Sequence, residues 1–183
     1  HRTNYYASPL VAGDKLYVAD TFNHTIRSVA LTNYEVKTLV GAPGVSGLTD
    51  GVGTMARLRT PQGLVAQGAF LYTVSFDGVL RQIALSDLSV KTILGDSSDA
   101  RSVDGMGAVA RLGLGFGQPA LSKTDDTLYY LDRSANSIRK VDTKALTIQT
   151  VAGAKEPEAS TDGSLSISRF VSPAALAKTA DGQ

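Results

Sequence analysis

The chain has 183 residues, of which 43% are apolar and 19% charged, and its 18 Lys and Arg against 17 Asp and Glu give a formal net charge of +1. Such an even balance gives no electrostatic signature for nucleic acid or an anionic membrane. Cysteine is absent, which excludes disulfides, thiolate metal sites and cysteine nucleophiles within this stretch. No apolar run approaches the length of a membrane span, so we expect none.

From the N-terminus onward, the chain repeats itself three times. A Val-x-Thr-Leu-x-Gly string at residues 36–41 returns with small changes and ends at Gly41, Gly95 and Gly153, so the period is 54 and then 58 residues (95 − 41 and 153 − 95). Arg27, Arg81 and Arg139 each precede that glycine by 14 residues. Self-similarity with such constant internal spacing is typical of a repeat architecture.

Each repeat contains four short segments of β-branched and apolar residues, separated by turn residues. In the first repeat we expect strands at residues 9–12, 15–20, 25–31 and 35–40. In the second, Phe76-Asp77-Gly78 predicts a tighter hairpin, because Asp-Gly favours the positive φ of such turns. A four-stranded unit with this period predicts an all-β fold of β-propeller blades, each of four antiparallel strands, with an ordinary β-sandwich as the alternative.

By this spacing the blades cover about residues 8–58, 61–112 and 118–170, and a fourth begins at 173–183. The three blades therefore make a partial propeller, since none closes with three. We expect the chain to be a fragment of a longer protein, with a homodimer of two half-propellers as the alternative way to close a ring.

Two strings carry a resemblance to a known family: Leu-Tyr-Val-Ala-Asp-Thr-Phe-Asn-His-Thr-Ile-Arg at residues 16–27, and the segment 36–61, which reads Val-x-Thr-Leu-x-Gly, then Gly-x-x-Asp-Gly-x-Gly-x-x-Ala-Arg-Leu, then Pro61. They closely resemble the NHL repeat. The resemblance covers nearly the whole chain and implies a propeller, usually of six blades, that acts mostly as a binding scaffold. The second repeat departs from the pattern, because Ser75 replaces the Asp and the Asn-His pair is missing.

The most constant motif is an Asp-Gly pair followed by an arginine seven residues after the Asp: Asp50 and Arg57, Asp104 and Arg111, Asp162 and Arg169. These residues could form a calcium or ligand constellation, but ion-binding loops usually contain more carboxylates. We interpret them as a structural loop in which Asp caps backbone N–H groups of the turn and Arg anchors the loop against it or the next blade.

The three arginines at Arg27, Arg81 and Arg139 raise the hypothesis of RNA binding, because some NHL propellers bind RNA. An RNA-binding propeller would carry a basic face interleaved with aromatic residues, and the net charge offers none. We therefore expect each arginine to point outward from its strand and pair with a carboxylate of a neighbouring blade, and we expect no nucleic-acid partner.

No catalytic, metal or cofactor site is predicted. His24 could be a general base, but only one repeat has it, and a lone turn histidine is more often a hydrogen-bonding turn residue. A Gly-x-Ser-x-Gly nucleophile elbow is absent, and the expected inner strands hold almost no His, Asp or Glu. The alternative is part of a six-bladed hydrolase or lyase whose axial metal site other blades supply, as the resemblance to related propeller enzymes implies.

The turns between the second and third strands lie on the same face as the long loops between blades, and this face varies most between repeats. The sequence therefore predicts a binding face for a protein partner or a larger assembly, formed by Phe22, Asn23, His24, Phe76, Asp77 and Arg133, beside a four-residue insertion at residues 113–116. The predicted function is a non-enzymatic protein-binding or structural scaffold. The start at His1 and the lack of targeting signals favour an extracellular or cell-surface location.

Overall fold

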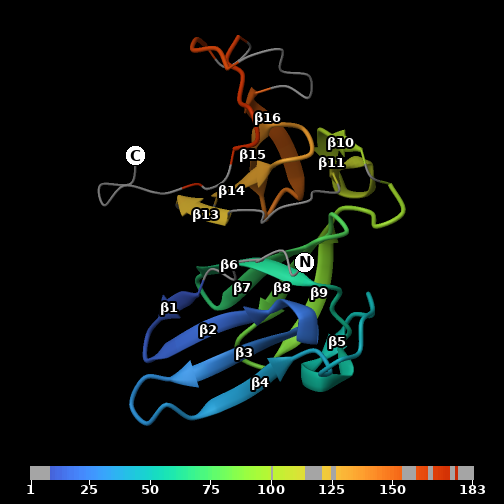
Figure 1. Ribbon diagram of the computed structural model, residues 1–183. Helices are drawn as coiled ribbons and strands as arrows, with labels where there is room; N and C mark the ends of the chain where they lie inside the picture. The colour runs from blue at the N-terminus through green and yellow to red at the C-terminus, as the bar shows by residue number, and fades with distance from the viewer. Residues whose placement is uncertain are drawn as a thin grey trace, which may run out of the picture. The chain divides into compact units, whose positions relative to one another are not determined.

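The computed structural model describes residues 9–99, 101–113, 127–153, 160–164, 167–173 and 176, and the backbone of 121–124. This part of the chain is all β, with short 3-10 turns at Thr21–Asn23 (η1), Gly53–Met55 (η2) and Gly107–Val109 (η3) (Figure 1). It contains no helix long and apolar enough to cross a membrane. The predicted fold class is confirmed: the chain forms β-propeller blades of four antiparallel strands.

Blade 1 consists of β1 (Leu10–Ala12), β2 (Lys15–Asp20), β3 (Thr25–Ala30) and β4 (Val36–Val40), hydrogen-bonded in that order. All three pairings are antiparallel. Each strand agrees with its expected range to within one residue at either end. The agreement follows from turn chemistry, because Gly13 at φ 61° and His24 at φ 59° end the strands where the sequence changes from apolar to turn residues.

Blade 2 consists of β6 (Pro61–Gln67), β7 (Phe70–Ser75), β8 (Leu80–Ala84) and β9 (Ser89–Leu94). A fifth strand, β5 (Gly51–Val52), pairs with the outer edge of β9. The range expected for the first blade, residues 8–58, includes residues 51–52. In the structure this connecting segment is part of the second sheet.

Blade 3 repeats the arrangement with β13 (Leu121–Thr124), β14 (Thr127–Asp132), β15 (Ser137–Asp142) and β16 (Thr147–Gly153). Here β11 (Gly105–Met106) pairs with the outer edge of β16. A short ladder of β10 (Ser102–Val103) and β12 (Arg111–Leu112) closes the loop that contains β11. The fourth blade expected from residue 173 onward lies almost wholly outside the described residues.

The chain divides into two compact units, residues 1–76 with 80–92, and residues 77–79 with 93–183. In the first unit, alternate residues of the strands of blades 1 and 2 form one apolar core, and β2 packs against β6. Its wholly buried members include Ile26, Val40, Leu58, Leu71 and Ile83. Burying each such side chain contributes about 1.5–3 kcal/mol, so this core is the main source of cohesion between these two blades.

A steric constraint explains why each repeated string ends in glycine. Gly41, Gly95 and Gly153 have φ values of 88°, 95° and 90°. A Cβ atom on Gly41 would collide with the carbonyl oxygen of His24, and one on Gly153 would collide with that of Asn136. Only glycine combines this positive φ with so close an approach of two backbone segments.

Candidate functional site

The Asp-Gly loop before blade 2 is fastened to that blade by Asp50. Its carboxylate accepts hydrogen bonds from the N–H of Thr92 at 3.0 Å and from Oγ1 of Thr92 at 3.0 Å. It also pairs with Nη1 of Arg81 at 3.2 Å, and the Arg81 side chain is fully buried. Asp50 thus joins the added strand β5 to two strands of the blade that follows it.

Asp104 has the same role before blade 3. It accepts from the N–H of Thr150 at 2.8 Å, from Oγ1 of Thr150 at 3.0 Å and from Nη2 of Arg139 at 2.8 Å. Partial burial by itself would raise the pKa of Asp104, but the hydrogen bonds from Thr150 and Arg139 outweigh it and hold the pKa below its ordinary value. The repeated contact shows that the loop aspartates have partners in the next blade, whereas the sequence interpretation placed those partners in the turn itself.

The loop arginines bond mainly within their own loops. Arg57 donates from Nη1 to the carbonyl oxygens of Thr54 at 2.7 Å and Ala56 at 2.8 Å. Arg111 donates to the carbonyl of Ala110 at 2.9 Å and to Asp99 at 3.1 Å. Each arginine holds the 3-10 turn of its loop closed, while the aspartate attaches the loop to the next blade.

Two of the three third-strand arginines are not the outward-pointing residues that alternation predicts. Arg81 and Arg139 are fully buried. Arg139 bridges Asp104 and the buried Asp132 of its own blade, and donates to the carbonyl of Arg111 at 2.6 Å. The expected orientation is wrong for these two, because the Asp-Gly loop covers the face on which they lie. Their guanidinium groups are therefore withdrawn from any ligand.

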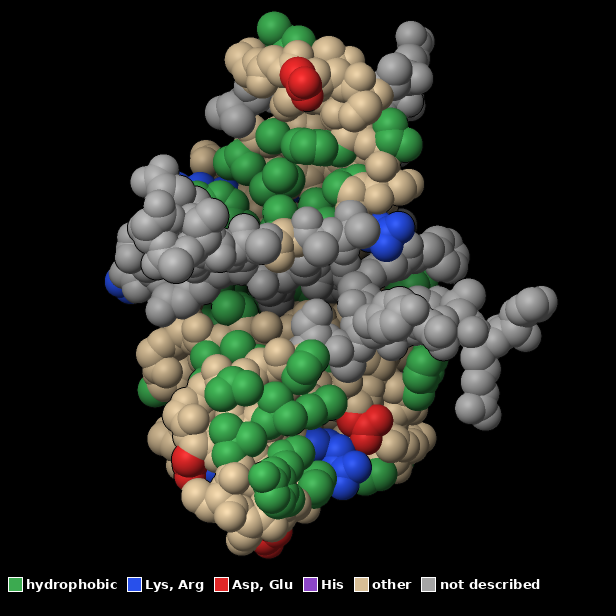
Figure 2. All heavy atoms as spheres, turned by 60° about the vertical axis from the view of Figure 1, so that its left-hand side comes forward, with side chains coloured by type: hydrophobic (Ala, Val, Ile, Leu, Met, Phe, Trp, Pro, Cys, Tyr) green, Lys and Arg blue, Asp and Glu red, His purple; other side chains and the backbone are tan. Residues whose placement is uncertain are grey.

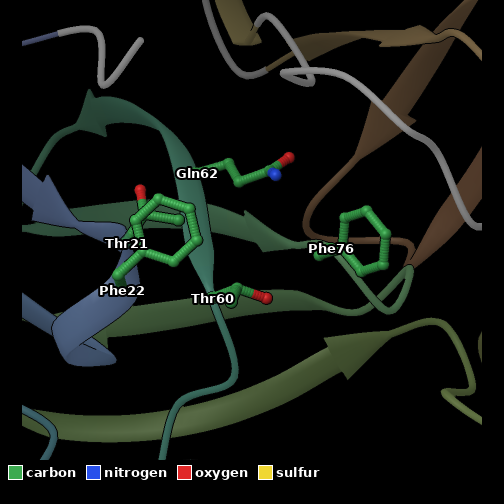
Figure 3. A pocket seen from close by; sticks show the side chains of 5 residues that line it. All are labelled: Thr21, Phe22, Thr60, Gln62 and Phe76. Atoms are coloured by element: carbon green, nitrogen blue, oxygen red, sulfur yellow. The ribbon is translucent and has the colours of Figure 1, made fainter. Parts of the chain in front are cut away.

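The first unit has a hollow of about 140 Å³ that two of the predicted binding residues line. Phe22, in η1, and Phe76, after β7, lie on either side of it, with Thr60 and Gln62 between them and Thr21 beside Phe22 (Figure 3). Phe22 is 67% exposed, whereas Gln62 is 3% exposed. The amide of Gln62 extends into the space between the two rings (Figure 3).

Two buried oxygens at this hollow have no hydrogen-bond partner among the described residues: Oγ1 of Thr60 and Oε1 of Gln62. A buried acceptor without a donor costs about 1–3 kcal/mol, so a ligand that donates a hydrogen bond recovers part of that cost. None of the five lining residues is charged. The hollow can therefore bind a neutral group that has an apolar body and a donor, and it offers no acid–base pair for catalysis.

His24 positions this hollow without lining it. Its Nδ1 accepts a hydrogen bond from the N–H of Thr60 at 3.0 Å, and Thr60 has φ 43°. In blade 3 the N–H of Ser172, which has φ 48°, donates to Oδ1 of Asn136 at 3.0 Å. The equivalent contact by asparagine supports the interpretation of His24 as a hydrogen-bonding turn residue.

The other predicted binding residues are dispersed. Asn23 is exposed and donates to Asp20 at 2.9 Å. Asp77 is buried, and Arg133 is half-buried in the turn after β14. Both belong to the second unit, and of the insertion at 113–116 only Gly113 is described.

Sequence reasoning missed Thr60 and Gln62. The available signal was the x-Pro-x triplet that opens each inner strand, with Thr60 before Pro61, Gln118 before Pro119 and Ser172 before Pro173. Within the described ranges there is no cluster of three or more His, Asp or Glu residues that could hold a metal.

No family model and no curated protein matches this chain. Several solved structures are similar to it. An auxiliary nutrient-binding protein from Bacteroides thetaiotaomicron is similar with a TM-score of 0.64 and 17% identity, over 91% of this chain and 40% of that one. A structural genomics protein of unknown function from the same organism has a TM-score of 0.66 and 21% identity, over 88% of this chain and 38% of that one.

Hydrazine synthase from Kuenenia stuttgartiensis is similar with a TM-score of 0.54 and 13% identity, over 93% of this chain and 37% of that one. At these identities the likeness shows the fold alone. The chain spans well under half the length of each of these proteins.

Proposed function

We propose that this chain is a non-enzymatic, NHL-type binding scaffold that receives an aromatic side chain of a protein partner in the hollow between Phe22 and Phe76. The observation that carries the proposal is the buried, unbonded Oε1 of Gln62 beside an exposed aromatic ring. Protein interfaces concentrate their binding energy in such pockets, where an aromatic anchor is buried against its partner.

The size of the hollow and its lack of charge define the occupant. An engineered cavity of about 150 Å³ holds benzene, so a hollow of about 140 Å³ accommodates one six-membered ring. Tyr and Trp combine an apolar ring with an O–H or N–H donor. The ring would pack between Phe22 and Phe76, and the donor would reach Gln62.

The test uses N-acetyl-tyrosinamide as a probe, with binding followed by NMR titration of the full chain. We expect saturable binding that weakens about tenfold or more in Phe22→Ala and Phe76→Ala, because each removes one apolar wall. Gln62→Leu should abolish the preference for N-acetyl-tyrosinamide over N-acetyl-phenylalaninamide, which lacks the donor.

Phe70→Ala is the matched control, because Phe70 is a partly exposed phenylalanine of β7 that does not line the hollow. Unchanged affinity in Phe22→Ala and Phe76→Ala, or a loss as large in Phe70→Ala, would contradict the proposal.

A second candidate is supported by the nutrient-binding description of one similar structure. In that case the hollow holds a small neutral nutrient such as a sugar, whose hydroxyls meet Gln62 and Thr60. The same titration with methyl glucoside distinguishes the two, since binding of the glycoside without the tyrosine derivative favours this candidate.

A further inference from the structure

The three blades differ at their outer edges. In blade 2 the edge strand β9 is paired with β5, and in blade 3 β16 is paired with β11. In blade 1 no described strand pairs with the outer edge of β4. Among the described strands, the same repeat therefore provides two covered edges and one edge without a cover.

The exposed fractions of equivalent side chains show the effect of the added edge strand. Val36 of β4 is 47% exposed, whereas its equivalents Val90 and Ile148 are 2% and 0% exposed. The side chain of Arg27 is 40% exposed, whereas those of Arg81 and Arg139 are 0% exposed. In the lower part of Figure 2, hydrophobic side chains lie on the surface beside charged ones.

The uncovered edge already has the geometry of the covered ones. Arg27 is paired with Thr38 in the β3–β4 register, as Arg139 is paired with Thr150. Both registers shift at the same place, between Ile26 and Arg27 and between Ile138 and Arg139. Arg27 contacts only Asp20 of its own blade, at 3.6 Å, among the ion pairs of the described chain. Arg139 has the equivalent contact with Asp132 and a second one with Asp104.

The chain also carries a third loop of the kind that covers such edges. Thr161 and Arg169 exchange backbone hydrogen bonds, as Arg57 and Thr49 do in part, and Gly163 has the same φ of 157° as Gly105. Asp162 is exposed. The sequence has Leu165 where the other loops have Gly53 and Gly107, so the equivalence extends to the Asp-Gly segment and not to the turn that follows it.

We propose that Asp162 and Gly163 of a second copy of this chain add as a short strand to the outer edge of β4, with the Asp162 carboxylate on Arg27 and Thr38. The copies would then join tail to head, with the third loop of one on the first blade of the other. Backbone pairing along an unpaired strand edge is an established mode of association. The charges of Asp162 and Arg27 are opposite, as those of Asp104 and Arg139 are in the covered edge of blade 3.

The test is sedimentation velocity over a range of protein concentrations, with a charge exchange between the two partners. We expect the unaltered chain to self-associate, and Arg27→Asp and Asp162→Arg each to weaken association at least tenfold, because each places two like charges at the junction. An equimolar mixture of the two variants should associate again, since its copies meet through one unaltered junction and one with the charges exchanged.

Lys37→Asp is the matched control, because Lys37 lies on the edge strand β4 and the substitution changes the charge by the same amount as Arg27→Asp, but the ion pair of Lys37 is with Glu35. It should leave association unchanged. Far-UV circular dichroism and urea midpoints establish that each variant is folded, and Asp162→Asn replaces any variant that is not.

Three results would overturn the proposal: an unaltered chain that stays monomeric at every concentration, a mixture that does not associate although each variant alone is weakened, or a loss in Lys37→Asp as large as that in Arg27→Asp. The hollow at Phe22 is not altered in any of these variants, so failure here is distinguishable from failure of the proposed function.

Discussion

Arg81 and Arg139 are completely buried, and a buried guanidinium group is tolerated only where acceptors surround it. Around Arg139 these acceptors are the carboxylates of Asp104 and Asp132 and the carbonyl oxygen of Arg111. Asp132 is itself buried and also accepts from Ser102 and Ser134. This arginine therefore joins the loop, the strand and the turn of blade 3 into one hydrogen-bonded network.

Arg139→Gln should lower the free energy of unfolding by about 3–5 kcal/mol, because removing one partner leaves buried carboxylate charge uncompensated. Urea denaturation measures the change. Arg101→Gln is the control, since the Arg101 side chain is largely exposed in its pair with Asp99 and its loss should have little effect. Equal losses in the two variants would show that the buried network does not stabilise the fold.

At the scale of elements, the connecting loop is a part of the sheet that follows it. β5 and β11 each contribute two residues of strand, and an aspartate just before each strand fastens it to the blade. The fourth strand of each blade ends at a glycine whose backbone touches the turn after the second strand. The outer strands of blades 2 and 3 are thus held at both ends.

Gly41→Ala should destabilise the chain by clearly more than the roughly 1–2 kcal/mol that a left-handed residue costs an alanine, because the new Cβ would also collide with the carbonyl of His24. Gly13→Ala measures the cost of the left-handed conformation alone, since Gly13 has φ 61° with no atom within 4 Å of an added Cβ. Both are compared by urea denaturation. If the two variants lose the same stability, the close approach at Gly41 is not what requires glycine.

At the scale of the whole molecule, charge is nearly balanced and the repeated arginines are largely withdrawn from solvent. The formal net charge is +1, and two of the three repeated arginines are fully buried. Binding to nucleic acid depends on accessible Lys and Arg that neutralise phosphates.

We therefore expect no binding of single-stranded RNA at physiological salt, as measured by fluorescence anisotropy of a labelled oligonucleotide. Weak binding of the oligonucleotide at low salt that disappears as salt rises would be the non-specific association shown by any protein with exposed lysines. Saturable binding that survives physiological salt would contradict the expectation and would require a basic surface beyond the described residues.

The sequence determined the elements because the period-2 alternation and the turn residues are local properties. Residues 15–20 were expected as a strand and are β2, since Gly13 and His24 set both ends of the hairpins around it. The repeat also indicated that blades are the unit of the fold, because the same loop motif returns three times at constant internal spacing.

Tertiary structure decided which distant groups meet. The spacing of Asp50 and Arg57 suggested that they act on one turn, but Asp50 bonds to Thr92 and Arg81 of the next blade, more than 30 residues away in sequence. The residues that line the hollow are a second example. Phe22 could be predicted as a binding residue from its place in a turn, but Gln62 could not. Gln62 became relevant only in the folded chain, where β6 packs against β2 and the side-chain oxygen of Gln62 is buried without a donor among the described residues. Local sequence specifies which groups are polar or apolar, and only the packing of strands distant in sequence determines which of them are left without a partner.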